Sequence, residues 1–150
     1  MTALKDQVQA DLHDAIRARD EIRKVALRML TAAIRNTEIE LRHELDDAGV
    51  LAVVQKQVKQ RRDSIVEFRK GGREDLVAKE EGELAWLEAY LPRQATREEI
   101  EAAARRAVAE TGASGPRDIG KVMPGLMQQF AGRTDGKMVS DIVRELLAGQ

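Results

Sequence analysis

The sequence predicts an all-α protein, and three observations lead to this fold class. Apolar residues recur at three- and four-residue spacing along most of the chain. Aromatic residues make up only 3% of the 150 residues, and β-branched residues are sparse beside Ala, Leu, Glu, Arg and Lys. Glycine and proline gather at a few places that separate the periodic stretches. We therefore expect helices packed on helices.

Four long helices are expected in the first part of the chain, over residues 3–18, 21–43, 48–70 and 73–89. The second is the most regular and keeps its apolar spacing over more than five turns. The third starts after Asp46 or Asp47, either of which can cap it, and ends at a glycine pair after Lys70. The fourth ends before Pro92, because proline disfavours helix for the preceding residue. Short connections then predict an antiparallel four-helix bundle over residues 1–92.

Three shorter helices are expected in residues 93–150. Thr96 and Glu99 form the capping pattern of a helix over residues 97–111. The segment "TGASGP" then breaks the chain, and Pro116 suits a first helical position. After the polar glycine turn "AGRTDGK", the last helix carries regularly spaced apolar residues: Met138, Val139, Ile142, Val143, Leu146 and Leu147. These helices are expected to form a small three-helix tail domain.

Charge and composition exclude several classes of protein. The net charge is −1, with 25 bases against 26 acids, so nucleic-acid binding would need a local basic patch. No cysteine is present, and His13 and His43 show no metal-ligand spacing. No phosphate-binding glycine motif occurs either. We expect no catalytic residue, metal or cofactor, and the lack of a long apolar run predicts a cytoplasmic protein with no membrane partner.

Two blocks of opposite charge lie on the third and fourth expected helices. Residues 56–73 carry seven bases against two acids, and residues 74–88 carry six acids against one base. If the two helices pair, the blocks largely neutralise each other. Alternatively, part of the basic block projects outward as a phosphate-facing stripe: Arg61, Arg62, Arg69 and Lys70. Arg61 interrupts the apolar seam of its helix, and a glutamate of the fourth helix is a possible partner for it.

A second group of bases flanks glycine-containing backbone in the tail: Arg117, Lys121, Arg133 and Lys137. Gly120 and Pro124 both weaken a helix, and they stand on either side of Lys121. One interpretation is a kinked helix whose Gly120 fits tightly under another helix. The other is a bare stretch of backbone beside Lys121 that is open to a phosphate or ribose. The two interpretations are compatible.

Three segments, taken in order, resemble the YqeY family of small bacterial proteins over essentially the whole chain. They are "RMLTAAIRNTEIE", "VVQKQVKQRRDSIVEFRKGGREDLVAKEEGELAWLEAYLP" and "DIGKVMPGLMQQFAGRTDGKMVSDIVRELL". The family is similar to the C-terminal portion of the GatB subunit of the glutamine-dependent amidotransferase that acts on misacylated tRNA. In that enzyme a helical domain is followed by a three-helix tail that contacts the outer part of the tRNA. The resemblance does not extend to the catalytic body of GatB, so it does not imply amidotransfer.

The sequence therefore predicts a non-catalytic module that binds tRNA or another structured RNA through its tail. The expected contacts are Lys121, Arg133 and Lys137, then Arg117, with Gly120 permitting close approach of the backbone. The first alternative is a helical adaptor that docks to an amidotransferase, a synthetase or another translation factor. The second is an accessory of an amidotransferase, for which the resemblance would suggest the class of carbon–nitrogen ligases with glutamine as amide donor.

Overall fold

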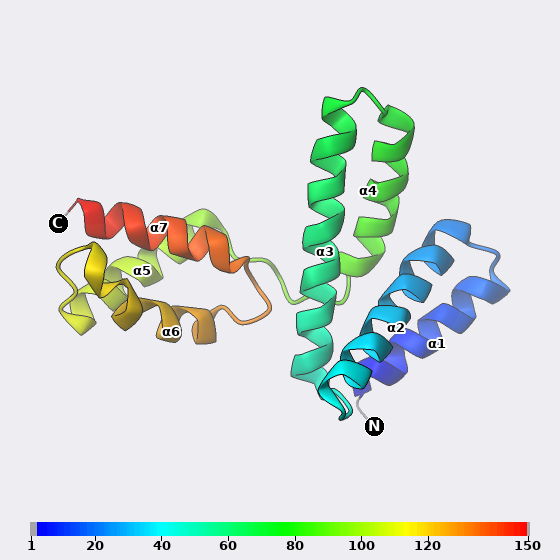
Figure 1. The fold of residues 1–150 in the computed structure, drawn as a ribbon, viewed down its shortest axis with the longest axis horizontal. Coiled ribbons are helices and arrows are strands. Elements are labelled where there is room, and N and C mark those ends of the chain that lie inside the picture. The colour runs from blue at the N-terminus through cyan, green and yellow to red at the C-terminus, as the bar shows by residue number, and fades with distance from the viewer. Residues whose placement is uncertain (1–2, 150) are drawn as a thin grey trace. The chain divides into compact units, whose positions relative to one another are not determined.

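The structure, a computed structural model, describes residues 3–149. It confirms the all-α class: within that range there are seven α-helices, one short 3-10 helix and no strand. In order these are α1 (Ala3–Arg17), α2 (Glu21–Leu41), α3 (Asp47–Lys70), α4 (Glu74–Glu88), α5 (Arg97–Thr111), the 3-10 helix η1 (Pro116–Asp118), α6 (Ile119–Gln129) and α7 (Gly136–Ala148) (Figure 1). The chain divides into two compact units, Met1–Leu91 and Pro92–Gln150, called unit 1 and unit 2 below.

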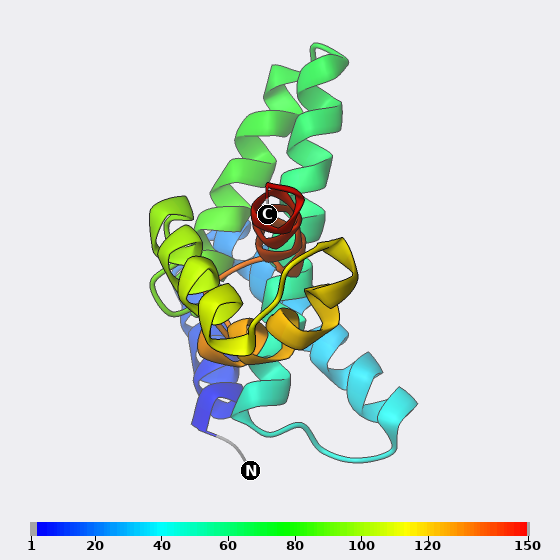
Figure 2. The same ribbon diagram turned by 90° about the vertical axis from the view of Figure 1, so that its left-hand side faces the viewer.

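Unit 1 is built from two helical hairpins. A three-residue connection joins α1 to α2, and another joins α3 to α4, so each pair runs antiparallel (Figures 1 and 2). The core between the hairpins takes its largest fully buried side chains from α2 and α4, with Leu27, Leu30 and Leu87 each at most 1% exposed. Burial of one such leucine contributes roughly 1.5–3 kcal/mol. These side chains hold the two hairpins together as one unit.

The ends of the helices in unit 1 follow local chemistry. Asp20 caps α2 by accepting a hydrogen bond from the Arg23 amide at 3.1 Å. Asp46 caps α3 in the same way, with the Gly49 amide at 2.8 Å. The expected second helix ends two residues early, because Arg42 adopts a left-handed conformation with φ of 61° and stops it at Leu41.

The far end of the α3–α4 hairpin extends beyond α1 and α2. Both views show its turn standing clear of the other hairpin (Figures 1 and 2). Ile65 and Val77 are buried in this part of the hairpin and lie outside the main core of unit 1. Gly72 closes the turn with φ of 71°, a conformation that glycine adopts readily. This end of the hairpin is therefore a two-helix structure.

Unit 2 is a triangle of helices in which α5, α6 and α7 all pack on one another. Its core takes one side of each helix, and Ile100, Leu126 and Ile142 are at most 1% exposed. Thr96 caps α5 with the Glu99 amide at 3.1 Å, as its sequence predicts. Phe130 follows α6 directly and fills the same core at 4% exposure.

Candidate nucleic-acid interface

Helix α6 runs without interruption through Pro124. Proline has no backbone N–H, so the carbonyl of Gly120 cannot accept the helical hydrogen bond that residue 124 would normally donate. A β-carbon added to Gly120 would meet no other atom within 4 Å, and the same holds for Gly125. The interpretation that Gly120 fits tightly under another helix is therefore wrong, because open space lies where a close neighbour was expected.

The outward side of α6 offers backbone rather than large side chains. Lys121, Pro124, Gly125 and Gln128 are all exposed, and their three- and four-residue spacing places them on one side of the helix. Gly120 is exposed at the edge of that side. We call this surface the open face of α6. A ligand can approach its main chain closely beside the ammonium group of Lys121.

Two cations stand at the start of the open face. Arg117 is exposed, and the described part of the chain gives its side chain no hydrogen bond or ion pair. Lys121 keeps 63% of its side chain exposed, with its Nζ 3.3 Å from Asp118. The pKa of Asp118 is lowered by a hydrogen bond from the Ser114 amide and by Lys121, so this carboxylate stays charged at neutral pH. One positive charge remains uncompensated at this end.

Arg133 has an internal role that its sequence position did not reveal. Its Nε donates to the Arg93 carbonyl at 2.9 Å, and its Nη2 donates to Glu99 at 3.0 Å. The guanidinium also lies 5.7 Å from the centre of the Phe130 ring, and only 28% of the side chain is exposed. A hydrogen bond from Arg93, and to a smaller extent the charge of Arg133, lower the pKa of Glu99. Arg133 thus ties the loop before α7 to the start of α5, and its contact with phosphate stays a prediction.

Lys137 lies in the first turn of α7 and is exposed. Its backbone amide donates to Asp135 at 2.7 Å, whereas its side chain has no partner among the residues that the structure describes. From Lys121 to the end of α6 at Gln129, a rise of 1.5 Å per residue amounts to about 12 Å. The four predicted bases therefore fall into two groups along the chain: Arg117 and Lys121 at the N-terminal end of α6, and Arg133 and Lys137 after its C-terminal end.

Two further exposed cations of unit 2 were not among the residues predicted from the sequence. Arg105 and Arg106 are exposed on α5, and neither forms an ion pair or hydrogen bond with any residue in 3–149. The signal that could have found them is a pair of adjacent arginines opposite the apolar side of α5.

The prediction that Arg61 projects outward is wrong. Arg61 is 8% exposed, and its Nε lies 3.3 Å from Glu83 and 3.5 Å from Glu80. Its Nη2 contacts the sulfur of Met29 on α2 at 2.9 Å. The Nε atom nevertheless donates no hydrogen bond of good geometry. The break in the apolar seam therefore marks a buried charge cluster between α3 and α4, with Glu83 only 2% exposed.

The other members of the expected basic stripe are exposed but paired. Arg62 binds Glu88 at 2.7 Å and Arg69 binds Glu81 at 2.8 Å, both across the α3–α4 interface. Lys70 pairs within its own helix, with Glu67 at 3.5 Å. These ion pairs favour the alternative in which the two charge blocks neutralise each other.

Glu83 gives unit 1 a pH dependence that can be measured. Burial raises the pKa of Glu83 above its ordinary value of 4.5, and nearby Arg61 opposes that rise. The folded state holds this proton more tightly than the unfolded state, so the free energy of unfolding falls as pH rises from 4.5 through the folded pKa. Glu83→Gln should remove this fall, as measured by urea unfolding at about pH 5 to 7.

The matched control is Glu88→Gln on the same helix, whose carboxylate is exposed. This variant should keep the slope of stability against pH that the unmodified protein shows. Glu38 does not disturb the measurement. A hydrogen bond from Lys5 lowers the pKa of Glu38, so the change in stability that Glu38 causes occurs below pH 4.5. Parallel curves for Glu83→Gln and the unmodified protein would contradict the assignment.

Comparison with known proteins gives one family match and several relatives. The family described as "Yqey-like protein" matches residues 5–147. The protein named "Altered inheritance of mitochondria protein 41, mitochondrial" from Saccharomyces cerevisiae strain S288c is 40% identical over 91 residues, which are 60% of this chain and 49% of the relative. The protein of the same name from Kluyveromyces lactis is 42% identical over 99 residues, 63% of this chain and 53% of its own. The chain thus spans about half the length of the curated relatives it matches.

No helix within residues 3–149 is long and apolar enough to cross a membrane. Within the same residues, no three histidine, aspartate or glutamate side chains are grouped so that they could hold a metal ion.

Proposed function

Because the chain belongs to the YqeY family, we propose that it is a non-catalytic module that binds tRNA or another structured RNA. In this proposal residues 1–92 act as a four-helix bundle domain. Residues 93–150 act as a three-helix domain that is similar to the tail of GatB and makes the RNA contact. The RNA-bound form takes part in tRNA-dependent amidotransfer or in translation.

The observation that carries the proposal is the open face of α6, with Arg117 and Lys121 at its start and an exposed lysine, Lys137, in the first turn of the next helix. On this face, Gly120 and Gly125 leave the main chain uncovered. A phosphate–ribose backbone needs positive charge and close approach, and this surface offers both.

The aromatic content of unit 2 favours a structured RNA over a single strand. Sequence-tolerant binding of single strands relies on bases stacked on exposed aromatic rings. The ring of Phe130 is buried in the core, and the tryptophan and tyrosine of the chain, Trp86 and Tyr90, belong to unit 1. RNA helices are recognised largely by their shape and backbone, which suits cations held on packed helices.

The test is a titration of labelled bulk tRNA with the purified protein across a salt series. The variant Arg117→Glu/Lys137→Glu removes two cations that make no internal contact in the described chain, so the fold should be kept. We expect the affinity for tRNA to fall at least tenfold. The slope of log affinity against log salt should become shallower by about 1.5, the value for two lost phosphate contacts.

The matched control is Lys56→Glu/Lys59→Glu, which makes the same change of charge at exposed positions of α3. Equal losses in both double variants would show that net charge, and not the surface of unit 2, governs binding. If the unmodified protein binds no tRNA even at low salt, the RNA proposal is wrong.

The second candidate function is that of a protein adaptor, and exposed apolar side chains of unit 1 favour it. Ile39 is 68% exposed and Leu41 is 50% exposed, both at the end of α2. In this alternative α2 docks to an amidotransferase, a synthetase or another translation factor, or the chain serves as accessory to a carbon–nitrogen ligase. If the protein does not bind tRNA, the adaptor function becomes the leading candidate.

The cytoplasmic location expected from the sequence stays a prediction. The yeast relatives carry the word "mitochondrial" in their names, and that word describes those proteins. An RNA partner would be available in either compartment, so the proposal does not depend on the location.

A further inference from the structure

Helix α2 carries two rows of apolar side chains, and the core of unit 1 covers only one of them. The covered row consists of Ala26, Leu27, Leu30 and Ile34. The second row lies on another side of the helix, at alternating spacings of three and four residues, and includes one polar residue: Ile22, Val25, Met29, Ala32, Asn36 and Ile39. We call it the outer seam of α2. A surface helix normally has one apolar stripe with polar residues opposite, so a second apolar row is unusual.

Most of the outer seam is open to solvent. Ile39 is 68% exposed, Met29 45% and Ile22 43%, and its other members are exposed or half-buried. The neighbouring helices touch only one edge of the seam. Met29 contacts Arg61 of α3, and Ile22 lies beside Gly82 of α4, where an added β-carbon would meet it at 3.2 Å. The core of unit 1 therefore leaves this row without a packing partner over much of its length.

A row of arginines runs beside the outer seam, and each follows a seam residue by three positions: Arg28, Arg35 and Arg42. They stand seven residues apart, which is about 10.5 Å along the helix. All three are exposed, and none forms a hydrogen bond or ion pair within the described part of the chain. An apolar seam is thus flanked on one side by three unpaired positive charges.

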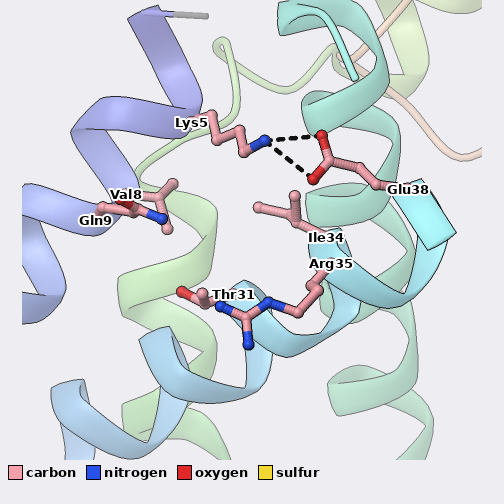
Figure 3. A pocket seen from close by; sticks show the side chains of 7 residues that line it. All are labelled: Lys5, Val8, Gln9, Thr31, Ile34, Arg35 and Glu38. Carbon is pink, nitrogen blue, oxygen red and sulfur yellow. Dashed lines mark hydrogen bonds and ion pairs between the residues drawn. The ribbon is translucent and has the colours of Figure 1, made fainter. Parts of the chain in front are cut away.

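Glu38 does not neutralise this row, although it lies three positions after Arg35, where a carboxylate usually pairs with a base. The Nζ of Lys5 lies 2.9 Å from one oxygen of Glu38 and 2.8 Å from the other, and the Leu45 amide donates to Glu38 at 2.8 Å. Figure 3 shows the Lys5–Glu38 pair, with Arg35 on the same side of α2 and no such interaction drawn to it. Glu38 is therefore committed to partners inside unit 1.

The other two acids of α2 do not pair with the arginines either. Glu21 forms an ion pair with Lys24 at 2.9 Å. Glu40 lies two positions before Arg42, and residues two apart on a helix do not face each other. The positive charge beside the outer seam is therefore left for a partner to compensate.

We propose that the outer seam of α2 binds an amphipathic helix of a partner protein whose apolar stripe is flanked by aspartate and glutamate. Alternating spacings of three and four are those of helices that pack side by side along their length. Charges at seven-residue intervals beside such a seam pair with opposite charges on the facing helix and select the partner. Asn36 is the polar residue within the seam, and a single polar residue there fixes the register of the two helices. The proposal does not rest on the RNA contact, and it gives the adaptor function a partner of stated chemistry.

Two other occupants fit the outer seam less well. A second copy of this chain, packed seam to seam, would bring two rows of arginines into one interface, where like charges repel. An RNA backbone would pair with the arginines but would leave Ile39 and Met29 without an apolar contact. An acidic amphipathic helix satisfies both the charged row and the apolar row.

The probe is a designed peptide of 21 residues, the length of α2, with leucine at the seam positions and glutamate on both flanks. Like charges on its flanks keep the peptide from pairing with itself. The peptide is titrated into the full-length protein, and backbone amide signals are followed by NMR. We expect saturable shifts of the amides of α2, with little change in unit 2. A peptide with lysine in place of glutamate, and an acidic peptide of the same composition in scrambled order, should each bind about tenfold more weakly.

The variant Arg28→Glu/Arg35→Glu should reverse the preference, so that the lysine peptide binds more tightly than the glutamate peptide. Both positions are exposed and without partners in residues 3–149, so the fold should be kept. Arg105→Glu/Arg106→Glu is the matched control, because it makes the same change of charge at exposed arginines of α5 and should leave the preference unchanged. Ile39→Ser should weaken binding of the glutamate peptide about tenfold, because one apolar contact is lost.

Several results would overturn the proposal. They are a glutamate peptide that does not bind saturably, equal binding of the scrambled peptide, and a preference that the Arg28→Glu/Arg35→Glu variant does not change or that the control changes equally. A loss of tRNA affinity in Arg28→Glu/Arg35→Glu as large as that in Arg117→Glu/Lys137→Glu would also overturn it, because the arginines of α2 would then contact RNA. The peptide titration reports on unit 1 alone, so its failure is distinguishable from failure of the RNA proposal.

Discussion

Replacement of Arg61 by alanine should lower the free energy of unfolding of unit 1 by about 3–5 kcal/mol, which is a large part of the stability of a domain of this size. Arg61 lies between the carboxylates of Glu83 and Glu80 at the α3–α4 interface. Without it, Glu83, which is 2% exposed, would lie near the carboxylate of Glu80 and would lose the cation that now lies 3.3 Å away. The cost of an unpaired buried charge exceeds the cost of the lost packing.

Urea unfolding followed by fluorescence of Trp86 measures this effect, because the chain contains one tryptophan and it lies on α4. The matched control is Arg62→Ala, which removes an exposed ion pair with Glu88 and should cost about 0.5 kcal/mol. A variant in which the whole cluster is replaced, Arg61→Met/Glu80→Gln/Glu83→Leu, should recover most of the loss. Equal losses in Arg61→Ala and Arg62→Ala would show that the buried cluster is not what stabilises this interface.

Replacement of Phe130 by alanine should destabilise unit 2 by about 3–5 kcal/mol. Phe130 is 4% exposed and packs with Leu126, Val139 and other core side chains of α5, α6 and α7. Its ring also lies under the guanidinium of Arg133, which ties the loop before α7 to the start of α5. The substitution thus creates a cavity and releases the loop that precedes Lys137.

Hydrogen exchange measured peptide by peptide is the appropriate method, because unit 2 has no tryptophan or tyrosine. We expect loss of protection in α5, α6 and α7, with protection in α1–α4 unchanged. Met138→Ala is the control, since this apolar side chain of α7 is 42% exposed and its truncation leaves no buried cavity. Equal loss of protection in both units would contradict the division of the chain into separate cores.

The helices could be predicted from the sequence because their signals are local. Apolar spacing, the caps at Asp46 and Thr96, and the glycines after Lys70 each act within a few residues, and the structure places helix ends within about two residues of the predictions. The break in the apolar seam at Arg61 also indicated a buried partner, and Glu83 and Glu80 are the glutamates that it meets.

The remaining features depend on residues that are distant in sequence. Open space beside Gly120 cannot be read from a glycine, because the same residue suits both close packing and exposure. The internal role of Arg133 depends on Arg93 and Glu99, which precede it by 40 and 34 positions.

The far end of the α3–α4 hairpin has a practical consequence. The turn after Lys70 closes a two-helix extension whose residues contribute nothing to the main core of unit 1. Extra residues in a surface turn cost little, because closure entropy rises slowly with loop length. The Gly71–Gly72 turn is therefore the place in unit 1 where a peptide tag or reporter can be inserted with least disturbance to the helices below it. An insertion there would change no residue of the open face of α6.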